Sequence, residues 1–298
     1  MKKKLVIASC CVMAIYFLMD HLGRNDESSG KQNLHASDKV AKSLQSVGHP
    51  TFASPHASPI TLIGGLLFVV NTPADTVDVI DVQTFEIRKR IDVGVDPVSV
   101  AVRPDGKELW VSNHVSDSVS VIDTEASSST YLQVVDSVQD FDPETKATRF
   151  DEPVGIAFAN EEKAYVALSS ENQIAIVDVV NRVVTGHLKI PAQDPRQIVV
   201  RNGLLYVIPF ESNNRTQLSG GTGEIDGELV TFNAHEHSIA NNNVLSLGAV
   251  VDIVKHPKVP DRDLFVFDTE SDRLVEVVNS LGTLLYGMAV DSQGHVYI

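Results

Sequence analysis

Four acidic residues between positions 125 and 151 form a pattern that could bind a metal ion. They are Asp140, Asp142, Glu144 and Asp151, and the first three alternate along the chain. Oxygen ligands at alternating positions of one loop are what Ca²⁺ requires. Thr145, however, occupies the position where such a loop needs glycine, and Pro143 restricts its centre. The segment is therefore either a calcium loop or a solvated acidic loop. No cofactor is predicted in the residues present, and calcium is the one alternative that this segment leaves open.

A second candidate metal site is the run His235-Glu236-His237. In an extended segment His235 and His237 point to the same side, and this spacing suits zinc or copper. No third ligand is adjacent in the sequence, although His256 could approach in space. The alternative interpretation is an exposed polar loop.

One polar run is predicted to bind a ligand, and it consists of Glu211, Ser212, Asn213, Asn214 and Arg215. It interrupts a repeat in the sequence at a point where the other copies have a short turn. Departures from a repeat fall on loops, which carry binding groups. The alternative is an ordinary surface loop. The spacing of residues identifies no Ser-His-Asp or paired-carboxylate arrangement, so no catalytic residue is predicted.

Cysteine chemistry is excluded from most of the chain. Cys10 and Cys11 are its only cysteines, and both lie in the first apolar run. The chain after residue 11 therefore has no disulfide, no thiolate nucleophile and no cysteine ligand for zinc. It also lacks the C-x-x-C-H sequence that attaches a c-type haem.

The N-terminus has the pattern of an export signal. Lysines at positions 2–4 precede the uncharged segment 5–19, whose 15 residues suit a signal peptide and are short for a spanning helix. The lysines predict that this end stays in the cytoplasm while the rest is exported. An uncleaved anchor, cleavage and lipidation at Cys10 are alternatives, and segment 5–19 is the predicted membrane contact. Residues 20–57 are polar and predict a flexible linker.

The amino-acid composition argues against nucleic acid as a partner. The 298 residues include 24 Lys and Arg against 39 Asp and Glu, which gives a net charge of −15. An acidic chain of this kind is not expected to bind nucleic acid through a basic face. Its 43% hydrophobic content is that of an ordinary globular protein.

A repeat dominates the chain after residue 57. The segment 109–113 matches 67–71, and Asn113 lies 42 residues after Asn71. Asp123 follows Asp81 at the same offset. We identify five copies, which contain residues 67–81, 109–123, 164–178, 204–232 and 264–278.

Each copy predicts four short antiparallel strands. Its second strand carries an aromatic residue, its third strand alternates and ends in Asp, and the first turn is of the type Pro104-Asp105-Gly106. Four strands per ~40 residues are typical of a propeller blade. A β-sandwich is the alternative, but it has no reason to repeat a strand pattern at a fixed offset.

The recurring residues are predicted to be structural. Asp81, Asp123 and Asp178 end equivalent strands, where a carboxylate can accept backbone N–H bonds of the following turn. The recurring aromatic residues are predicted to pack between blades, and they are Phe68, Trp110, Tyr165, Tyr206 and Phe265.

The second copy resembles the YVTN-type β-propeller repeat. It runs through Pro97–Lys107 into Trp110-Val111-Ser112-Asn113, which stands where that family has Tyr-Val-Thr-Asn, and Phe68–Asn71 does so in the first copy. Copies three to five depart from the motif, because Tyr165–Leu168 and Tyr206–Pro209 lack the Asn. The resemblance implies an exported bacterial or archaeal surface-layer-like protein, a ring of about seven blades and no demonstrated catalysis.

The predicted domains follow from these patterns. Residues 1–19 are a signal peptide or anchor, 20–57 a linker and 58–298 an all-β propeller. Residues 285–298 match the start of a copy, so we expect five blades and the beginning of a sixth, in a propeller truncated at its C-terminus.

The expected function is that of an exported, non-catalytic β-propeller at the periplasm or cell surface. It would bind another envelope protein or a small ligand, since multi-blade rings present divergent loops on a rigid frame. One alternative is the recognition module of a larger c-type-cytochrome-like redox protein. The other is a propeller enzyme of lactonase or hydrolase type, whose activity would require carboxylates, histidine or metal near the axis.

Overall fold

The computed structural model describes residues 54–211, 262–282 and 284–298, and the backbone of four short strands between residues 216 and 255. These ranges hold 22 β-strands and a three-residue 3₁₀ turn at Thr72–Ala74. A helix that could cross a bilayer was not found within them. The predicted export signal and the linker up to residue 53 lie outside the described residues.

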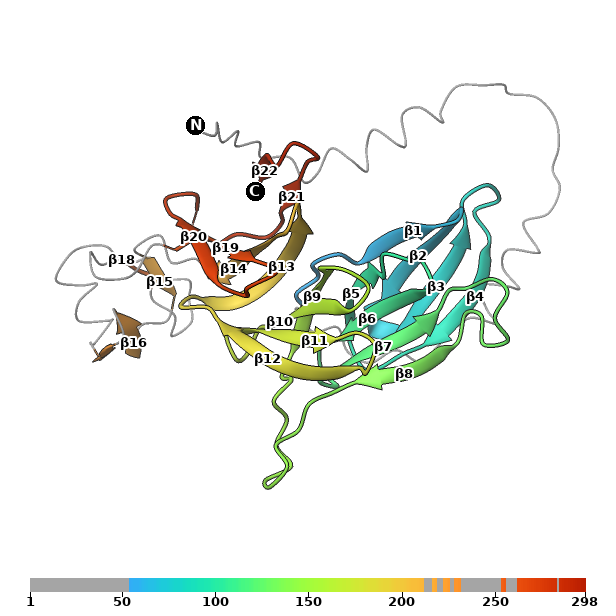
Figure 1. Cartoon of the computed structure of the whole chain (residues 1–298), viewed down its shortest axis with the longest axis horizontal. Helices are drawn as coiled ribbons and strands as arrows, with labels where there is room; N and C mark the ends of the chain where they lie inside the picture. Colours follow the sequence, from blue (N-terminus) through green and yellow to red (C-terminus); the bar gives the residue numbers. More distant parts are fainter. Residues whose placement is uncertain are drawn as a thin grey trace.

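Three blades are four-stranded antiparallel sheets whose strands follow one another in chain order (Figure 1). Blade 1 contains β1 (Ile60–Ile63), β2 (Leu66–Asn71), β3 (Thr76–Asp81) and β4 (Ile87–Asp92). Blade 2 contains β5 (Pro97–Val102), β6 (Glu108–Asn113), β7 (Ser118–Asp123) and β8 (Val134–Val138). Blade 3 contains β9 (Pro153–Phe158), β10 (Lys163–Leu168), β11 (Gln173–Asp178) and β12 (Val183–Lys189).

Blade 4 corrects the predicted number of blades. It combines two predicted copies, because β13 (Gln193–Arg201) and β14 (Leu204–Glu211) pair with β19 (Leu264–Asp268) and β20 (Leu274–Val278). The described residues therefore form four complete blades and the two-stranded start of a fifth, made of β21 (Ala289–Val290) and β22 (Val296–Tyr297). The sequence pattern specifies strands but not which strands pair across a long insertion.

The insertion between β14 and β19 contains two separate strand pairs. β15 (Thr216–Leu218) pairs with β18 (Ile253–Lys255), and β16 (Thr222–Ile225) pairs with β17 (Glu228–Thr231). The predicted strand 229–232 is therefore β17 in large part, but it belongs to a hairpin and not to a blade. The insertion occupies the place of the short turn between the second and third strands of blades 1 to 3.

The first strands of the blades lie side by side. β1 contacts β5, β5 contacts β9, β9 contacts β13, and β13 contacts β21. Sheets that meet through their first strands in this order are arranged around a common axis. The predicted β-propeller class is therefore confirmed.

Apolar side chains between neighbouring blades form the core. Phe68 and Val79 of blade 1 pack with Leu109 and Val111 of blade 2, and all four side chains are buried. Trp110 lies between blades 2 and 3, where its ring meets Phe158 edge-on at 5.1 Å. The five aromatic residues predicted to pack between blades are all buried, which confirms that prediction. Each buried side chain of this size contributes roughly 1.5–3 kcal/mol of transfer free energy.

The aspartates that end the third strands hold the turns that follow. The Asp81 carboxylate accepts the backbone N–H of Gln83 at 2.8 Å, and Asp178 accepts that of Asn181 at 2.8 Å. Asp123 and Asp268 accept equivalent bonds from Glu125 and Ser271. The structural role predicted for Asp81, Asp123 and Asp178 is confirmed, and Asp268 has the same role in blade 4.

Gly155 marks a close approach between blades 3 and 4. A Cβ at this position would collide with the carbonyl oxygen of Arg196 on β13. We therefore expect Gly155→Ala to lower the free energy of unfolding by about 1–3 kcal/mol, because backbone atoms cannot yield as a flexible side chain can. The control is Gly186→Ala on β12, where the added Cβ would lie 3.5 Å from Ile176 Cδ1. Urea denaturation measures both, and equal stabilities of the two variants would contradict this packing.

The turn aspartates predict sensitivity to acid. Backbone N–H donors lower the pKa of Asp178 and of Asp268 in the folded chain. The two carboxylates therefore stabilise the folded state at pH values above their unfolded pKa of about 3.9. This stabilisation is lost as the pH falls through their lower pKa in the folded chain. We expect the midpoint temperature of thermal unfolding to decrease when the pH is lowered below about 4. The decrease should be smaller in Asp178→Asn, because this side chain keeps an acceptor oxygen but does not titrate. An unchanged pH profile in this variant would exclude the contribution of Asp178.

Candidate functional site

The loops of the propeller divide between two faces. Because successive strands of a blade are antiparallel, the turns within strand pairs 1–2 and 3–4 lie on one face, called here the turn face. The turns between strands 2 and 3 and the connections between blades lie on the opposite face, called here the loop face. The loop face contains residues 72–75, 93–96, 114–117, 139–152, 169–172, 190–192 and both ends of the insertion 212–261.

Neighbouring blades are clamped together on the loop face by the same contact at three seams. A side-chain oxygen before the third strand of one blade accepts the backbone N–H of a residue that leads into the next blade. The three pairs are Asp75 with Asp96 at 2.8 Å, Asp117 with Glu152 at 3.1 Å, and Asn172 with Asp194 at 2.8 Å. All six residues have positive φ, between 47° and 61°. These polar groups therefore fix the arrangement of the blades.

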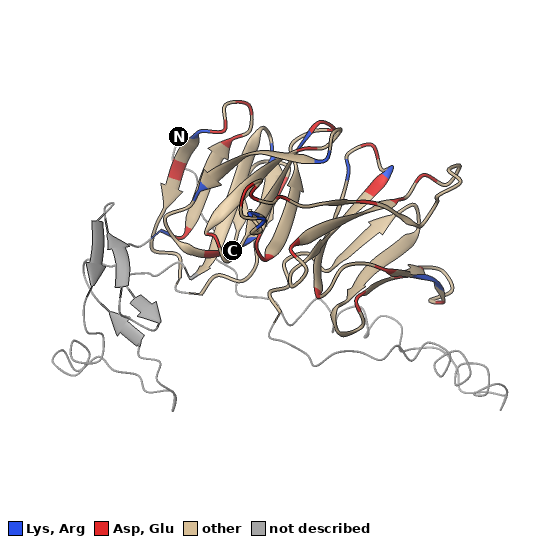
Figure 2. Ribbon diagram, turned by 90° about the horizontal axis from the view of Figure 1, so that it is seen from below, with Lys and Arg blue, Asp and Glu red and all other residues tan. Residues whose placement is uncertain are grey.

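Carboxylates crowd together where blades 2 and 3 meet on this face. Burial raises the pKa of Asp117, and the neighbouring charges of Asp151 and Glu152 act in the same direction. Burial also raises the pKa of Glu171, again with a contribution from Asp151. Figure 2 shows acidic residues in the loops at the ends of the strands. The crowding produces a negative potential that would attract a cationic group.

The connection between blades 2 and 3 is a projecting hairpin. Phe141 bridges Thr148, and the backbone N–H of Arg149 donates to the Asp140 carbonyl. The hairpin stands clear of the blades (Figure 1) and exposes 46% of Phe141. The hairpin therefore carries an exposed aromatic ring on the loop face.

The four acids predicted as calcium ligands lie on this hairpin and beside it. Asp142 accepts the backbone N–H of Glu144 and of Thr145, and Asp140 pairs with Arg149 at 3.1 Å. Asp151 lies instead with Asp117. The described residues contain no group of three or more His, Cys, Asp or Glu side chains placed to hold a metal ion. The calcium loop stays a prediction, and of its carboxylates Asp142 has the hydrogen bonds of a turn.

The two other predicted sites fall in or beside the insertion. Glu211 ends β14, while Ser212–Arg215, His235 and His237 lie outside the described residues. The chain leaves blade 4 at the end of β14. It returns at Arg262, which donates to the Pro191 carbonyl between β12 and β13. Both ends of the insertion therefore belong to the loop face.

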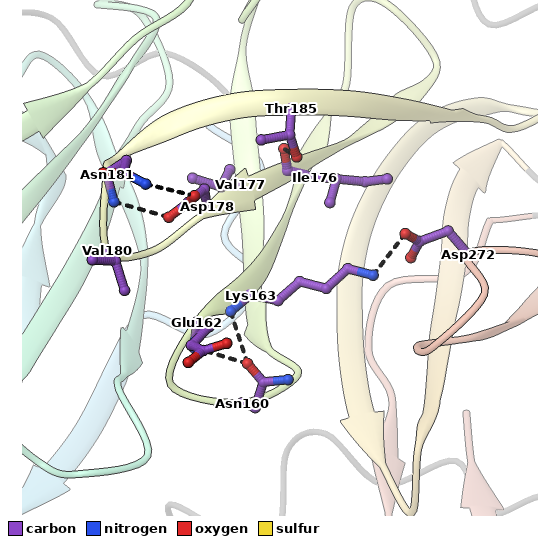
Figure 3. Close-up of a pocket in the computed structure, with 10 residues that line it drawn as sticks. All are labelled: Asn160, Glu162, Lys163, Ile176, Val177, Asp178, Val180, Asn181, Thr185 and Asp272. Carbon is purple, nitrogen blue, oxygen red and sulfur yellow. Dashed lines mark hydrogen bonds and ion pairs between the residues drawn. The ribbon is translucent and has the colours of Figure 1, made fainter.

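On the turn face, a groove of about 610 Å³ lies against blades 3 and 4 (Figure 3). Lys163 extends across it from β10, and its Nζ lies 2.6 Å from Asp272 Oδ2 in the turn between β19 and β20. The hydroxyl of Tyr165 donates to the other oxygen of Asp272 at 2.6 Å. Burial and the hydrogen bond to Asp272 raise the pKa of Tyr165, so its hydroxyl stays protonated and acts as a donor.

The polar groups of the groove are engaged in local contacts. Asn160 accepts the backbone N–H of Lys163, Asn181 is bonded to Asp178, and Thr185 donates to the Ile176 carbonyl. The Lys163 ammonium donates to Asp272 and to the Thr269 carbonyl. The groove therefore acts as a seam that ties blade 3 to blade 4.

A second ion pair ties blade 2 to blade 3 at the equivalent place. Arg182 in the turn between β11 and β12 lies 2.9 Å from Glu108 and 2.6 Å from Asp136. Glu108 also accepts the indole N–H of Trp110. Neither ion pair was predicted from the sequence. Glu108 and Lys163 occupy the same position in two copies of the repeat but carry opposite charges, so the position shows no recurring residue type. Their common position, the first residue of the second strand, was the available signal.

Comparison with known proteins supports the fold and shows no family. No family model matches the chain. Among curated proteins, Protein NirF from Stutzerimonas stutzeri is 35% identical over 78 residues, which are 26% of this chain and 20% of that protein. The matched part thus spans about a fifth of NirF.

Two solved structures are similar over most of the chain. The WD40 β-propeller domain of Doa1 has a TM-score of 0.51 and 9% identity, over 80% of this chain and 58% of that one. A chain of the Mitotic Checkpoint Complex has a TM-score of 0.51 and 10% identity, over 79% of this chain and 57% of that one. At these identities the likeness establishes the propeller fold alone, and the chain spans less than two thirds of each structure.

The Lys163–Asp272 pair yields a test of the seam. Lys163→Glu places two negative charges together, and we expect it to reduce the free energy of unfolding by about 1 kcal/mol or somewhat more. The double variant Lys163→Glu, Asp272→Arg reproduces the charges of Glu108 and Arg182, so it should recover part of the loss. Denaturation of both variants measures the coupling, and equal losses in the single and double variants would rule out a stabilising pair.

Proposed function

We propose that this chain is a β-propeller scaffold that binds a partner protein through its loop face. The observation that carries the proposal is that the projecting hairpin 139–152 and the insertion 212–261 both emerge on that face. On the turn face the turns have at most five residues, except for residues 124–133 between β7 and β8, and the ion pairs there join blade to blade. Long loops on one face of a rigid frame are the usual place for binding groups.

The charge of the loop face indicates the kind of partner. Where blades 2 and 3 meet, the charges of Asp151 and Glu152 help to raise the pKa of Asp117, and the charge of Asp151 helps to raise the pKa of Glu171. The nearby hairpin adds the exposed ring of Phe141. A partner with basic side chains around an apolar pocket would satisfy both features.

The proposal also covers the cellular location of the protein and its family. We place the protein in the periplasm or at the cell surface, because its first 19 residues have the pattern of an export signal. We also assign it to the YVTN-type propellers. Asn113 of the YVTN-like motif is fully buried and donates to Ser118 and Ser120, which gives this Asn a structural reason. Recovery of the protein in the cytoplasmic fraction of its host would refute the export.

A photo-cross-linker tests binding through the loop face. We expect a benzoylphenylalanine at position 141 to give a discrete protein adduct in cells of the native host. The matched control carries the same group at Val180, which is 64% exposed on the turn face. The adduct at position 141 should weaken as the salt concentration of isolated envelopes rises from about 0.05 to 0.5 M. Equal adducts at both positions, or none at position 141, would contradict the proposal.

A further inference from the structure

The chain enters the propeller on the loop face. Residues 54–58, called here the strap, run along β5, where the backbone N–H of Ser58 donates to Ser99 Oγ at 3.2 Å. At the start of β5 the hydroxyl of Ser54 donates to Asp96 Oδ1 at 2.9 Å. The polypeptide that precedes Ser54 therefore joins the blades on the loop face, at the seam between blades 1 and 2.

Two exposed valines lie beside this entry point. Val95 directly precedes Asp96, and its carbonyl accepts the backbone N–H of Val115 at 3.3 Å. The two residues, called here the valine pair, are 40% and 51% exposed. The equivalent residues of the next blade are Asp151 and Ser170, so the fold does not require apolar side chains at these positions. The valine pair therefore offers apolar surface that blade packing does not use.

Carboxylates continue this surface toward the seam between blades 2 and 3. Val115 shares the turn between β6 and β7 with Asp117. Burial raises the pKa of Asp117, and the neighbouring charges of Asp151 and Glu152 raise it further. The loop face thus presents an apolar pair next to negative charge. A segment that covered it would need apolar side chains together with positive charges.

The residues that precede the strap have this composition. Segment 39–53 contains two lysines, one histidine and no Asp or Glu, in a chain with 39 acidic residues against 24 Lys and Arg. Its large apolar residues are Val40, Leu44, Val47 and Phe52. Lys42 lies 12 residues before Ser54, so it can reach up to ~40 Å from the strap, which is enough for the neighbouring seam.

We propose that residues 39–53 dock on the loop face of their own chain, with apolar side chains on the valine pair and the two lysines beside Asp117, Asp151 and Glu152. The segment then occupies the surface that the partner protein uses, and the partner must displace it. This inference rests on the proposed function, since it describes how binding at the same face is regulated.

The tether favours this occupant over a second copy of the chain. A segment joined to the strap by a short stretch of chain acts at an effective concentration of about a millimolar, whereas a second copy is present only at the concentration of the protein. Two copies would also bring two acidic loop faces together, and like charges repel each other.

Cross-linking within the purified chain of 298 residues tests the docking. We expect a benzoylphenylalanine at position 115 to react mainly with residues 39–53, as read by mass spectrometry of the digested monomer. The linked fraction should be the same from about 0.1 to 10 µM protein, because the contact is intramolecular. The matched control carries the group at Val180, which is 64% exposed on the turn face. Equal links from both positions, no link from position 115, or a link that grows with protein concentration would overturn the proposal.

Charge reversal tests the role of the two lysines in the same measurement. Lys39→Glu combined with Lys42→Glu should lower the linked fraction at least about threefold at low salt, because like charges then face one another. Arg24→Glu combined with Lys31→Glu changes the net charge equally but lies outside the segment, so it should leave the fraction unchanged. Equal losses in the two double variants would show that docking does not depend on these lysines and would overturn the proposed contact.

The partner adduct at position 141 separates this inference from the proposed function. In cells, Lys39→Glu combined with Lys42→Glu should raise that adduct at least about threefold, because the partner no longer competes with a docked segment. An unchanged adduct means that the segment does not regulate the face, which overturns the inference while the proposed function stands. Loss of the adduct in every variant refutes the proposed function and with it the competition, whereas the internal link, which is read without any partner, still decides the docking.

Discussion

The structure depends on one constraint: a sheet with two apolar faces must be covered on both. β6 and β7 of blade 2 and β10 of blade 3 are buried along nearly their whole length, with no alternation between an inner and an outer side. Such a sheet is stable only between two others. Stacking blades around an axis meets this need, and it brings the first strands together so closely that Gly155 has no room for a side chain.

Polar contacts at the two faces then hold neighbouring blades together. On the loop face, a carboxylate or amide oxygen holds the backbone of the next blade, and this contact is the same at three seams. On the turn face the ion pairs differ in polarity, because Arg182 pairs with Glu108 between blades 2 and 3, and Asp272 pairs with Lys163 between blades 3 and 4. If blade 4 followed blade 2, Asp272 would meet Glu108, and two negative charges would be brought together. Matched pairs therefore disfavour wrong orders as well as stabilise the observed one.

The loop face can carry longer connections than the turn face. Because the seams are held by short turns and repeated contacts, a connection on the loop face can lengthen without disturbing the stack. The hairpin 139–152 and the insertion 212–261 are both of this kind. The long insertion splits blade 4 between its second and third strands, and the sheet still pairs in register from Leu204 to Val207. Backbone pairing across blade 4 is thus independent of what the insertion contains.

The sequence by itself determined the class of fold, the strands, the turn aspartates and the aromatic residues between blades. Each of these depends on local periodicity or on contacts within a turn, which a repeat makes visible. Only the tertiary structure decided that copies four and five are one blade, because pairing across 50 residues leaves no local signal. It also decided that Glu108 and Lys163 are equivalent residues. The charge at this position depends on the residue that faces it in the next blade, Arg182 or Asp272. A position that is acidic in one copy and basic in another does not stand out as a repeated residue type in the sequence.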